Sequence, residues 1–410
     1  MPYVLLGLAV FGLVTSAVFA GIVLWAVPGY LRERRLALAQ LAARPGFTPP
    51  LTLLKPLHGA DPGLESYLET FFTQDYPAYE ILFCARAATD AGLETARRVA
   101  ARHPQIPVQF LSTGGDTDYI NAKVASMELM EAHAAQDILV ISDSDVRVSS
   151  DYLRSVALPF ADPNVGGMCC LYRGGAAPQN GSKTGLWARL EAVGMSVEMS
   201  AGVLAARAME GMQFTLGPTM AFRREIIRRM GGFKVTADYC ADDFILGNET
   251  HRLGQSVVLS HHAIDHMVLH SGLIGSLKHQ VRWMKSTRFS RPLGHLGTAL
   301  TFSVPFGLLA FAAGLAMHRP ALALTLLAYS IANRIILAAL VGSLAVQERH
   351  LPRTTLLYPL RDFLGFCCWA ASYIGGTILW RGRRYRLSRG GLMEPLARGQ
   401  SEKTEHAMTT

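Results

Sequence analysis

The chain has 410 residues, half of them hydrophobic, and a formal net charge of +8. This length accommodates one large globular domain plus membrane segments, and the positive mean hydropathy argues against a purely soluble protein. Basic residues are not interleaved with aromatic side chains in the polar part of the chain, which argues against nucleic acid as a partner. The six cysteines have neither zinc-ligand spacing nor a disulfide pattern, so we expect reduced thiols.

The chain begins with an uncharged run at 3–31, longer than the roughly 20 apolar residues that cross a bilayer. A cluster of arginines at 32–35 follows, which predicts that this end of the helix faces the cytoplasm. A cleaved signal peptide is the alternative, because 17–20 resembles a cleavage site, but no Lys or Arg precedes the run. We therefore predict a transmembrane anchor at 1–31 and a juxtamembrane linker at 32–47.

A globular domain is predicted at 48–292, where short apolar runs alternate with amphipathic helical patterns. The alternation predicts strands at 50–54, 79–84, 108–111 and 138–141 and helices at 64–72, 92–102 and 123–134. Such an order predicts an α/β domain with a mostly parallel sheet and helices on both faces. Ligands of such sheets bind at the carboxyl ends of the strands.

Asp143 and Asp145 directly follow the predicted strand at 138–141 and are separated by one serine. Two carboxylates so spaced can share a hard cation such as Mg²⁺ or Mn²⁺, while a diphosphate fills its other positions. The alternative is a polar turn that caps the next helix. Because the pair ends a fully apolar strand in an α/β pattern, we favour the cation site.

A second acidic pair, Asp242 and Asp243, opens a helical pattern about a hundred residues later. A carboxylate within reach of a hydroxyl can remove its proton, whereas acidic residues in a first helical turn can simply favour the helix dipole. Spacing alone does not separate these roles. Lys123 begins an earlier predicted helix and is a candidate phosphate ligand, with an exposed surface lysine as the alternative.

Residues 278–291 form a basic helical segment that contains Arg282 and Trp283, with basic residues repeating on one helical face. One interpretation is an interfacial helix whose basic groups touch lipid heads and whose tryptophan lies in the aromatic belt. The other is that Arg282 stabilises a departing diphosphate, because fixed positive charge is favourable where negative charge develops.

Three apolar stretches follow, at 293–317, 321–346 and 355–380. Three crossings would put the basic tail outside, against the positive-inside rule. We therefore predict two crossings plus one re-entrant or interfacial stretch, the third, within 293–380, and a basic and then disordered cytoplasmic tail at 381–410. Arg334, Arg361 and Asp362 lie in this apolar context, where they either bind an acceptor head group or bridge helices.

These motifs, in this order, resemble ceramide glucosyltransferases and, more closely, bacterial hopanoid-biosynthesis glycosyltransferases. The likeness runs from about residue 48 to residue 391 and includes the leading membrane helix. It is carried by Leu53–Leu57 with Gly59–Pro62, Leu68–Phe72 with Asp75–Pro77, the two acidic pairs, Arg282-Trp283 and Trp380–Leu387. The resemblance implies a GT-A fold, which is a Rossmann-like nucleotide-diphospho-sugar domain, with transmembrane helices in the bacterial inner membrane.

The same resemblance implies roles for individual residues. Asp243 would be the general base, and Arg282 and Trp283 would belong to the family's (Q/R)xxRW element. Donor binding would fall to residues around the diphosphate: Asp90, Lys123, Asp143, Asp145, Asp242 and His279. Of these, Asp143 and Asp145 would also hold the divalent cation, Mg²⁺ or Mn²⁺. The implied reaction is an inverting transfer from a UDP-sugar, with N-acetylglucosamine and a polyhydroxylated hopanoid in the hopanoid branch.

The chain departs from the family pattern at two positions. The acidic residue usual shortly after the second strand is replaced by Ala87, and Asp90, three residues on, is the candidate substitute for uracil recognition. The first position of the (Q/R)xxRW element is His279. Histidine keeps a hydrogen-bond donor there, so we expect changed affinity more than lost activity.

Three other functions fit parts of the pattern. The same chemistry on a sphingolipid-like acceptor would make the protein a ceramide glucosyltransferase. A processive polysaccharide synthase would need more helices to line a polymer channel. A non-catalytic lipid transporter that binds nucleotide-sugar would consume no donor and would tolerate substitution of Asp243. We favour sugar transfer to a lipid hydroxyl, with N-acetylglucosamine and a hopanoid as the expected substrates.

Overall fold

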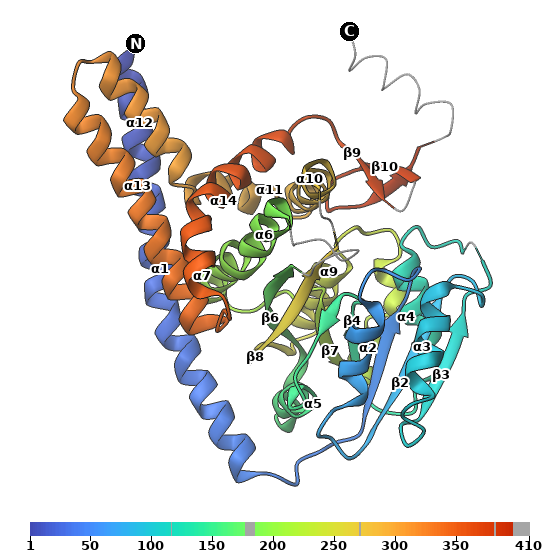
Figure 1. The fold of residues 1–410 in the computed structure, drawn as a ribbon. Coiled ribbons are helices and arrows are strands. Elements are labelled where there is room, and N and C mark those ends of the chain that lie inside the picture. Colours follow the sequence, from blue (N-terminus) through green and yellow to red (C-terminus); the bar gives the residue numbers. More distant parts are fainter. Residues whose placement is uncertain (116, 177–184, 270–271, 381–382, 397–410) are drawn as a thin grey trace.

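The computed structural model describes the chain except for residues 116, 177–184, 270–271, 381–382 and 397–410. The last of these ranges holds most of the tail predicted to be disordered, so that prediction lies outside the described residues. An α/β domain, a projecting arm of long helices and a layer of helices between them make up the molecule (Figure 1).

The α/β domain is built on an eight-stranded sheet of order β3-β2-β1-β4-β7-β6-β8-β5. In chain order the strands are β1 (Leu51–Pro56), β2 (Tyr79–Ala85), β3 (Val108–Ser112), β4 (Ile138–Ser142), β5 (Val146–Arg147), β6 (Val165–Ala176), β7 (Thr219–Arg223) and β8 (Ser256–Val268). The four strands β3, β2, β1 and β4 are parallel. β7 runs antiparallel between β4 and β6, while β8 pairs parallel with β6 and antiparallel with β5.

The α/β class predicted from the sequence is confirmed, and the alternation in the first half of the domain matches the observed elements. The helices of this part are α2 (Leu64–Phe72), α3 (Ala91–Ala100), α4 (Ala122–His133), α5 (Tyr152–Ala157), α8 (Arg224–Arg229) and α9 (Asp242–Arg252). The sheet is more mixed than the expected mostly parallel one, because β7 enters it in the opposite direction. Strand direction depends on the connection between strands, and apolar periodicity does not encode it.

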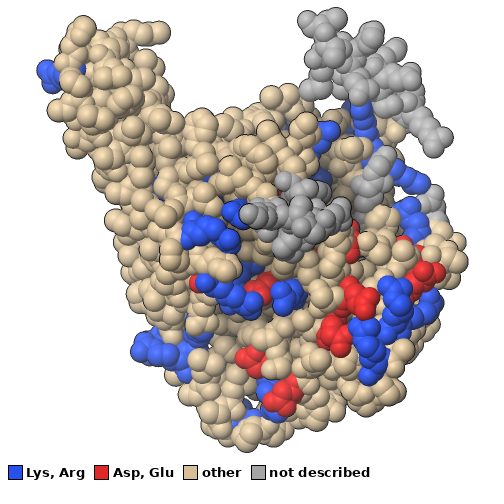
Figure 2. Space-filling view, viewed as in Figure 1, with Lys and Arg blue, Asp and Glu red and all other residues tan. Residues whose placement is uncertain are grey.

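The arm consists of α1 (Pro2–Ala43), α12 (Val304–Ala316) and α13 (Pro320–Leu340), with a short π-helical extension, η5 (Val341–Ala345). Figure 2 shows its outer part almost without charge. Among the described residues, two helices are long and apolar enough to cross a membrane, Pro2–Ala43 and Pro320–Ala345. A third span results if the helices on either side of a 50° bend, Pro292–Thr301 and Val304–Ala316, count as one.

The bend before α12 has a defined cause in a buried carboxylate. One oxygen of Asp362 accepts hydrogen bonds from the backbone amides of Ser303 and Val304, at 2.9 and 2.8 Å, and so caps α12. The other oxygen pairs at 3.3 Å with Arg334 of α13, which also donates to the hydroxyl of Ser16 in α1. These apolar-context charges therefore bridge helices, which was one of their two predicted roles.

A layer of helices lies between the arm and the sheet. It contains α6 (Leu186–Val193), the π-helical turn η2 (Gly194–Met199), α7 (Ser200–Glu210), α10 (Leu273–Ser290), α11 (Pro292–Thr298) and α14 (Leu351–Ala371) (Figure 1). The apolar stretch predicted at 355–380 is not one helix. Its end forms β9 (Thr377–Trp380), which pairs with β10 (Arg383–Leu387) and, through it, β11 (Met393–Pro395), because two glycines at 375–376 separate it from α14.

The close contact between β6 and α6 gives a test of this packing. A Cβ added at Gly174 would lie 2.1 Å from the backbone oxygen of Ala192. We therefore expect Gly174→Ala to lower the free energy of unfolding by about 1–3 kcal/mol, since backbone must move. Gly202→Ala, on an exposed helical site with nothing within 4 Å, is the control and should change stability by less than about 1 kcal/mol. Equal denaturation midpoints of the two variants in detergent would contradict the packing.

Candidate active site

The first acidic pair lies where β4 ends, at the carboxyl edge of the parallel strands. β4 ends at Ser142, and the backbone amide of Asp143 donates to the carbonyl of Pro218, just before β7. The carbonyl of Asp145 accepts from the amide of Met267 in β8. The turn is thus held by backbone hydrogen bonds to β8 and to the residue before β7. Both carboxylates therefore lie at the edge of the sheet where ligands of such sheets bind.

Lys123 joins the two acidic motifs. It lies in the first turn of α4, and its ammonium is 2.8 Å from Oδ1 of Asp143 and 3.6 Å from Oδ2 of Asp242. Burial alone would lower the pKa of Lys123, but Asp143 and Asp242 outweigh it and the pKa is raised. The lysine is therefore a fixed positive charge inside the site, and not the exposed surface lysine of the alternative interpretation.

Asp145 has one engaged oxygen and one open oxygen. Its Oδ2 lies 3.3 Å from Nε2 of His266, whereas its Oδ1 is buried and has no hydrogen-bond partner among the described residues. The same holds for Oδ2 of Asp242. Burial works against the charge on Asp145, but His266 and then Lys55 lower its pKa below the ordinary value. Carboxylate oxygens are ligands of the kind that Mg²⁺ and Mn²⁺ take.

The donor set also limits how a cation could be held. In the described part of the chain, no three His, Cys, Asp or Glu side chains stand close enough to hold a metal ion by themselves. Mg²⁺ is usually bound by one or two carboxylates together with substrate phosphates. Asp143 and Asp145 supply two carboxylates at the sheet edge, the number that such an arrangement takes from the protein.

Asp243 is positioned by backbone groups in the first turn of α9. Its Oδ2 accepts from the amide of Gly217 at 2.7 Å, and its Oδ1 from the amide of Phe244 at 2.8 Å. Burial, and then the neighbouring Asp242, raise the pKa of Asp243 to about 6, although Lys123 acts in the opposite direction. A carboxylate of this pKa is ionised at neutral pH and takes up a proton more readily than an ordinary one.

Lys55 is a residue of this region that we did not single out from the sequence. It lies on β1, is fully buried, and donates to the carbonyl of Asp143 at 2.7 Å and to the hydroxyl of Ser142 at 3.3 Å. Its ammonium lies 3.7 Å from the ring centroid of Phe71. Burial lowers its pKa to about 7 against the pull of the two carboxylates. In the sequence, the sign of its importance is a single lysine within an otherwise uncharged strand.

The basic helix α10 brings the next group of predicted residues to the site. The Arg282 guanidinium lies beside the Cys240 thiol, two residues before Asp242, and burial lowers the pKa of this arginine against the effect of Cys240. The ring of Trp283 lies 4.3 Å from that of His279 and 6.3 Å from that of His266, measured between centroids. Trp283 therefore lies near His266, the partner of Asp145, and Arg282 lies beside the thiol that precedes the second acidic pair.

Glu191 of α6 is a second residue that sequence reasoning missed. It is 2% exposed, and its Oε1 lies 2.7 Å from Nδ1 of His279. Its other oxygen accepts from the hydroxyl of Ser276, also on α10. Glu191 thus fixes α10 against α6 and orients the histidine that packs on Trp283. An isolated acid in the apolar pattern of α6 was the signal for it.

The structure gives Asp90, the candidate uracil ligand, two backbone partners. It is the N-cap of α3, where Oδ1 accepts from the amide of Gly92 at 2.8 Å. The same carboxylate accepts from the amide of Gly59 at 3.0 Å. Asp90 therefore ties the end of β1 to the start of α3, and a role in uracil recognition stays a prediction.

The structure brings eight of the nine predicted residues into one connected region: Lys123, Asp143, Asp145, Asp242, Asp243, His279, Arg282 and Trp283. An α/β sheet with an acidic pair after its central parallel strand and a second pair opposite is the architecture of the GT-A class, the nucleotide-sugar-dependent glycosyltransferases.

The chain belongs to glycosyl transferase family 21, whose sequence profile matches residues 9–393. It is 24% identical over 354 residues to ceramide glucosyltransferase 3 of Caenorhabditis elegans, which covers 85% of this chain and 74% of that protein. A shorter match, 33% identical over 116 residues, joins it to the ceramide glucosyltransferase of Candida albicans, with 26% of this chain and 21% of that protein covered. The prediction of a relationship to ceramide glucosyltransferases is confirmed.

Solved structures of similar shape are also glycosyltransferases by name. The mannosyltransferase PcManGT from Pyrobaculum calidifontis, in complex with GDP-Man and Mn²⁺, is 20% identical, with 89% of this chain and 98% of that chain covered and a TM-score of 0.49. Glucosyl-3-phosphoglycerate synthase from Mycobacterium tuberculosis, in complex with Mg²⁺ and UDP, is 15% identical, with 62% and 83% covered and a TM-score of 0.37.

Replacement of the predicted base gives the first test of the site. Asp243→Asn keeps the shape of the side chain and one acceptor oxygen but cannot take a proton. We expect the turnover number to fall at least about 100-fold, with donor binding largely retained. The comparison is Asp238→Asn, in the loop before α9, which should keep the wild-type rate. A near-normal rate for Asp243→Asn, measured by product formation, would exclude this residue as the base.

The raised pKa of Asp243 predicts a dependence of rate on pH. A base acts only when it is ionised, so the rate is full above its pKa, about 6, and is lost as pH falls through that value. We expect kcat/KM to fall about tenfold per pH unit below that point. A profile that stays flat down to pH 4.5 would contradict the assignment.

Proposed function

We propose that this protein moves a sugar from a UDP-sugar to a hydroxyl of a membrane lipid, with inversion at the anomeric carbon. The observation that carries the proposal is the cluster of Lys123, Asp143, Asp242 and Asp243 at the sheet edge, with Arg282 of α10 beside Cys240, two residues before Asp242. Basic groups and carboxyl groups occur there together, as binding a diphosphate and deprotonating a hydroxyl both require.

The residues of the chain divide the reaction between them. Asp243 takes the proton of the acceptor hydroxyl while the hydroxyl oxygen attacks the anomeric carbon from the face opposite UDP. The bond from that carbon to the diphosphate breaks, and its electron pair leaves with UDP. Lys123 and Arg282 offset the charge that develops on the diphosphate. A single displacement on an α-linked donor gives a β-glycoside.

Asp143 and Asp145 are the residues that would hold a divalent cation. When bound, Mg²⁺ or Mn²⁺ supplies further positive charge against the donor diphosphate. The open, buried Oδ1 of Asp145 supports this assignment. His266, which contacts the other oxygen of Asp145, orients that carboxylate.

The acceptor is proposed to reach the site from the membrane. α10 and α14 pack together between the acidic cluster and the apolar arm, and Arg282 lies on α10. α1, the bent helix pair at 292–316 and α13 are proposed to cross the bacterial inner membrane, with α14 interfacial. The two crossings after the α/β domain keep the tail on the same, cytoplasmic side as that domain. The arginines that follow the apolar part of α1 support that orientation.

Two pairs of sugar and lipid are candidates, and different observations support each pair. The sequence pattern resembles the hopanoid branch of the family, which favours N-acetylglucosamine and a polyhydroxylated hopanoid. The relatives that match are named ceramide glucosyltransferases, and one of them spans 85% of this chain. Glucose transfer to ceramide is therefore the second candidate, with the same residues in the same roles.

A direct transfer assay separates these candidates. The purified full-length protein in detergent, with Mn²⁺, would receive UDP-N-acetylglucosamine or UDP-glucose, each with a polyhydroxylated hopanoid or with ceramide. We expect a product of one N-acetylhexosamine on the hopanoid by mass spectrometry. Glucosylated ceramide would keep the mechanism and replace the substrate pair. Donor binding with no product from any pair, while Asp243→Asn binds equally well, would support a non-catalytic carrier.

A further inference from the structure

A cavity separate from the acidic cluster lies between α1 and the body of the protein. It has a volume of about 740 Å³ and is formed where α1 passes the end of α7 and the start of β8. Its β8 residues, Val257 to Leu259, precede His266 by seven to nine positions, which places them about 25–30 Å from it along an extended strand. The cavity is therefore not part of the sugar-transfer site.

Between the large side chains of Trp25 and Arg32, the face of α1 that lines the cavity carries little side-chain volume. Pro28 and Gly29 line it, and a Cβ added at Gly29 would meet nothing within 4 Å. Beside it, the hydroxyl of Tyr30 donates to the carbonyl of Ser260 at 3.2 Å, which holds α1 on β8. The gap is thus bordered by a fixed helix–strand contact.

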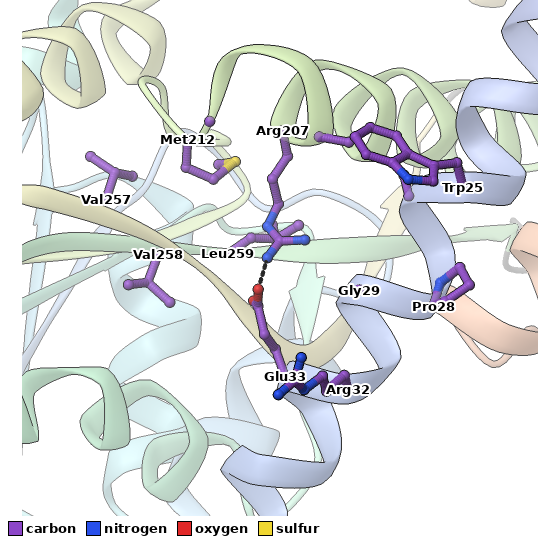
Figure 3. Close-up of a pocket in the computed structure, with 13 residues that line it drawn as sticks. Trp25, Pro28, Gly29, Arg32, Glu33, Arg207, Met212, Val257, Val258 and Leu259 are labelled. Atoms are coloured by element: carbon purple, nitrogen blue, oxygen red, sulfur yellow. Dashed lines mark ion pairs between the residues drawn. The ribbon is translucent and has the colours of Figure 1, made fainter.

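The walls are apolar and the rim is basic. In Figure 3, Met212, Val258 and Leu259 lie on one side and Trp25 on the other, while Arg207 of α7 reaches to Glu33 of α1, with which it forms an ion pair. Arg32 lines the same cavity. Two guanidinium groups against one carboxylate leave a positive rim beside apolar walls, so a ligand that fits carries both an anionic group and hydrocarbon.

The position of the cavity relative to the proposed membrane further limits the class of ligand that fits it. The cavity residues of α1 begin at Trp25, 68% exposed, and end at Glu33, so they straddle the end of the uncharged run at residue 31. Exposed tryptophans favour the membrane–water interface. η5, the end of the second apolar helix, packs on α1 as well. The cavity therefore lies at the level of lipid head groups.

We propose that this cavity binds an anionic phospholipid. The phosphate would lie between Arg32 and Arg207, and the glycerol and upper acyl carbons against Trp25, Met212 and Leu259. About 740 Å³ is within the usual size of small-molecule sites. The proposal rests on the membrane orientation proposed above, but not on the identity of the sugar or of the acceptor. A bound lipid would fill the gap between α1 and β8 and so fix the arm against the catalytic domain.

Quenching of Trp25 fluorescence tests the site in the full-length protein. The chain has five tryptophans, so the Trp25 signal is the difference between the protein and its Trp25→Phe variant. Both would be placed in phosphatidylcholine vesicles that contain either brominated phosphatidylglycerol or brominated phosphatidylcholine at equal mole fraction. We expect about fivefold stronger quenching by the anionic lipid, the preference that one basic residue at a membrane surface confers.

Three variants distinguish a specific lipid-binding site from general electrostatic attraction to an anionic membrane. Arg32→Gln should remove the preference, whereas Arg35→Gln, one turn away and outside the cavity, should leave it unchanged. Gly29→Leu, which fills the cavity without changing charge, should reduce quenching by the anionic lipid.

Equal quenching by the two lipids, or equal loss in the Arg32 and Arg35 variants, would overturn the proposal. Release by inorganic phosphate at matched ionic strength would overturn the choice of a lipid.

Because the readout does not involve sugar transfer, it separates this inference from the proposed function. Lipid preference with no transferase activity would leave the cavity assignment standing. Transferase activity with no lipid preference would reject the cavity assignment and leave the sugar-transfer site untouched.

Discussion

A buried lysine between two carboxylates is the interaction on which the candidate site depends. Lys123 bonds to Asp143 from the end of β4 and lies near Asp242 from the start of α9, so it joins motifs separated by about a hundred residues. Without that charge, three carboxylates would face one another in a poorly solvated space, and removing one partner of a buried ion pair typically costs about 3–5 kcal/mol. The same lysine that holds the two acidic motifs together is the one proposed to contact the donor diphosphate.

The site is linked to the membrane arm through further buried pairs. Glu191 bonds to His279 of α10, and Arg361 of α14 pairs at 3.0 Å with Glu198 of η2. In the arm, Arg334 and Asp362 join α13 to α14. Buried pairs of this kind have one favourable geometry, because each mispaired charge is costly. They therefore set the positions of α10, α13 and α14 relative to the candidate site.

The sequence predicted those parts of the molecule in which local pattern and chemistry coincide. The strand before Asp143 is apolar throughout, so both its burial and the place of the acidic turn followed from the pattern. Arg282 was open to two interpretations, and both stay predictions. The fold adds that α10 packs on α6 and α14 and carries His279 and Trp283 to the region of His266.

Other features depend on contacts that no local pattern contains. Lys55 is the single charge of its strand and Glu191 the single acid of its helix, and their partners come from the end of β4 and from α10. The carboxylate of Asp90 has the right place along the chain for a uracil ligand, yet the amides of Gly59 and Gly92 engage it. The antiparallel β7 follows from the path of the chain between strands, which only the assembled sheet reveals.

The central claim is that the diphosphate of the donor binds at Lys123. Calorimetric titration of UDP with Mn²⁺ into the purified protein and into its Lys123→Gln variant tests it most directly. Lys234→Gln, at an exposed position in the 3-10 turn Phe233–Thr236 that follows α8, is the control. The account predicts at least about tenfold weaker binding by the Lys123 variant alone, because a charge-assisted bond to phosphate is lost. Unchanged affinity in a Lys123 variant with a normal unfolding midpoint would contradict it.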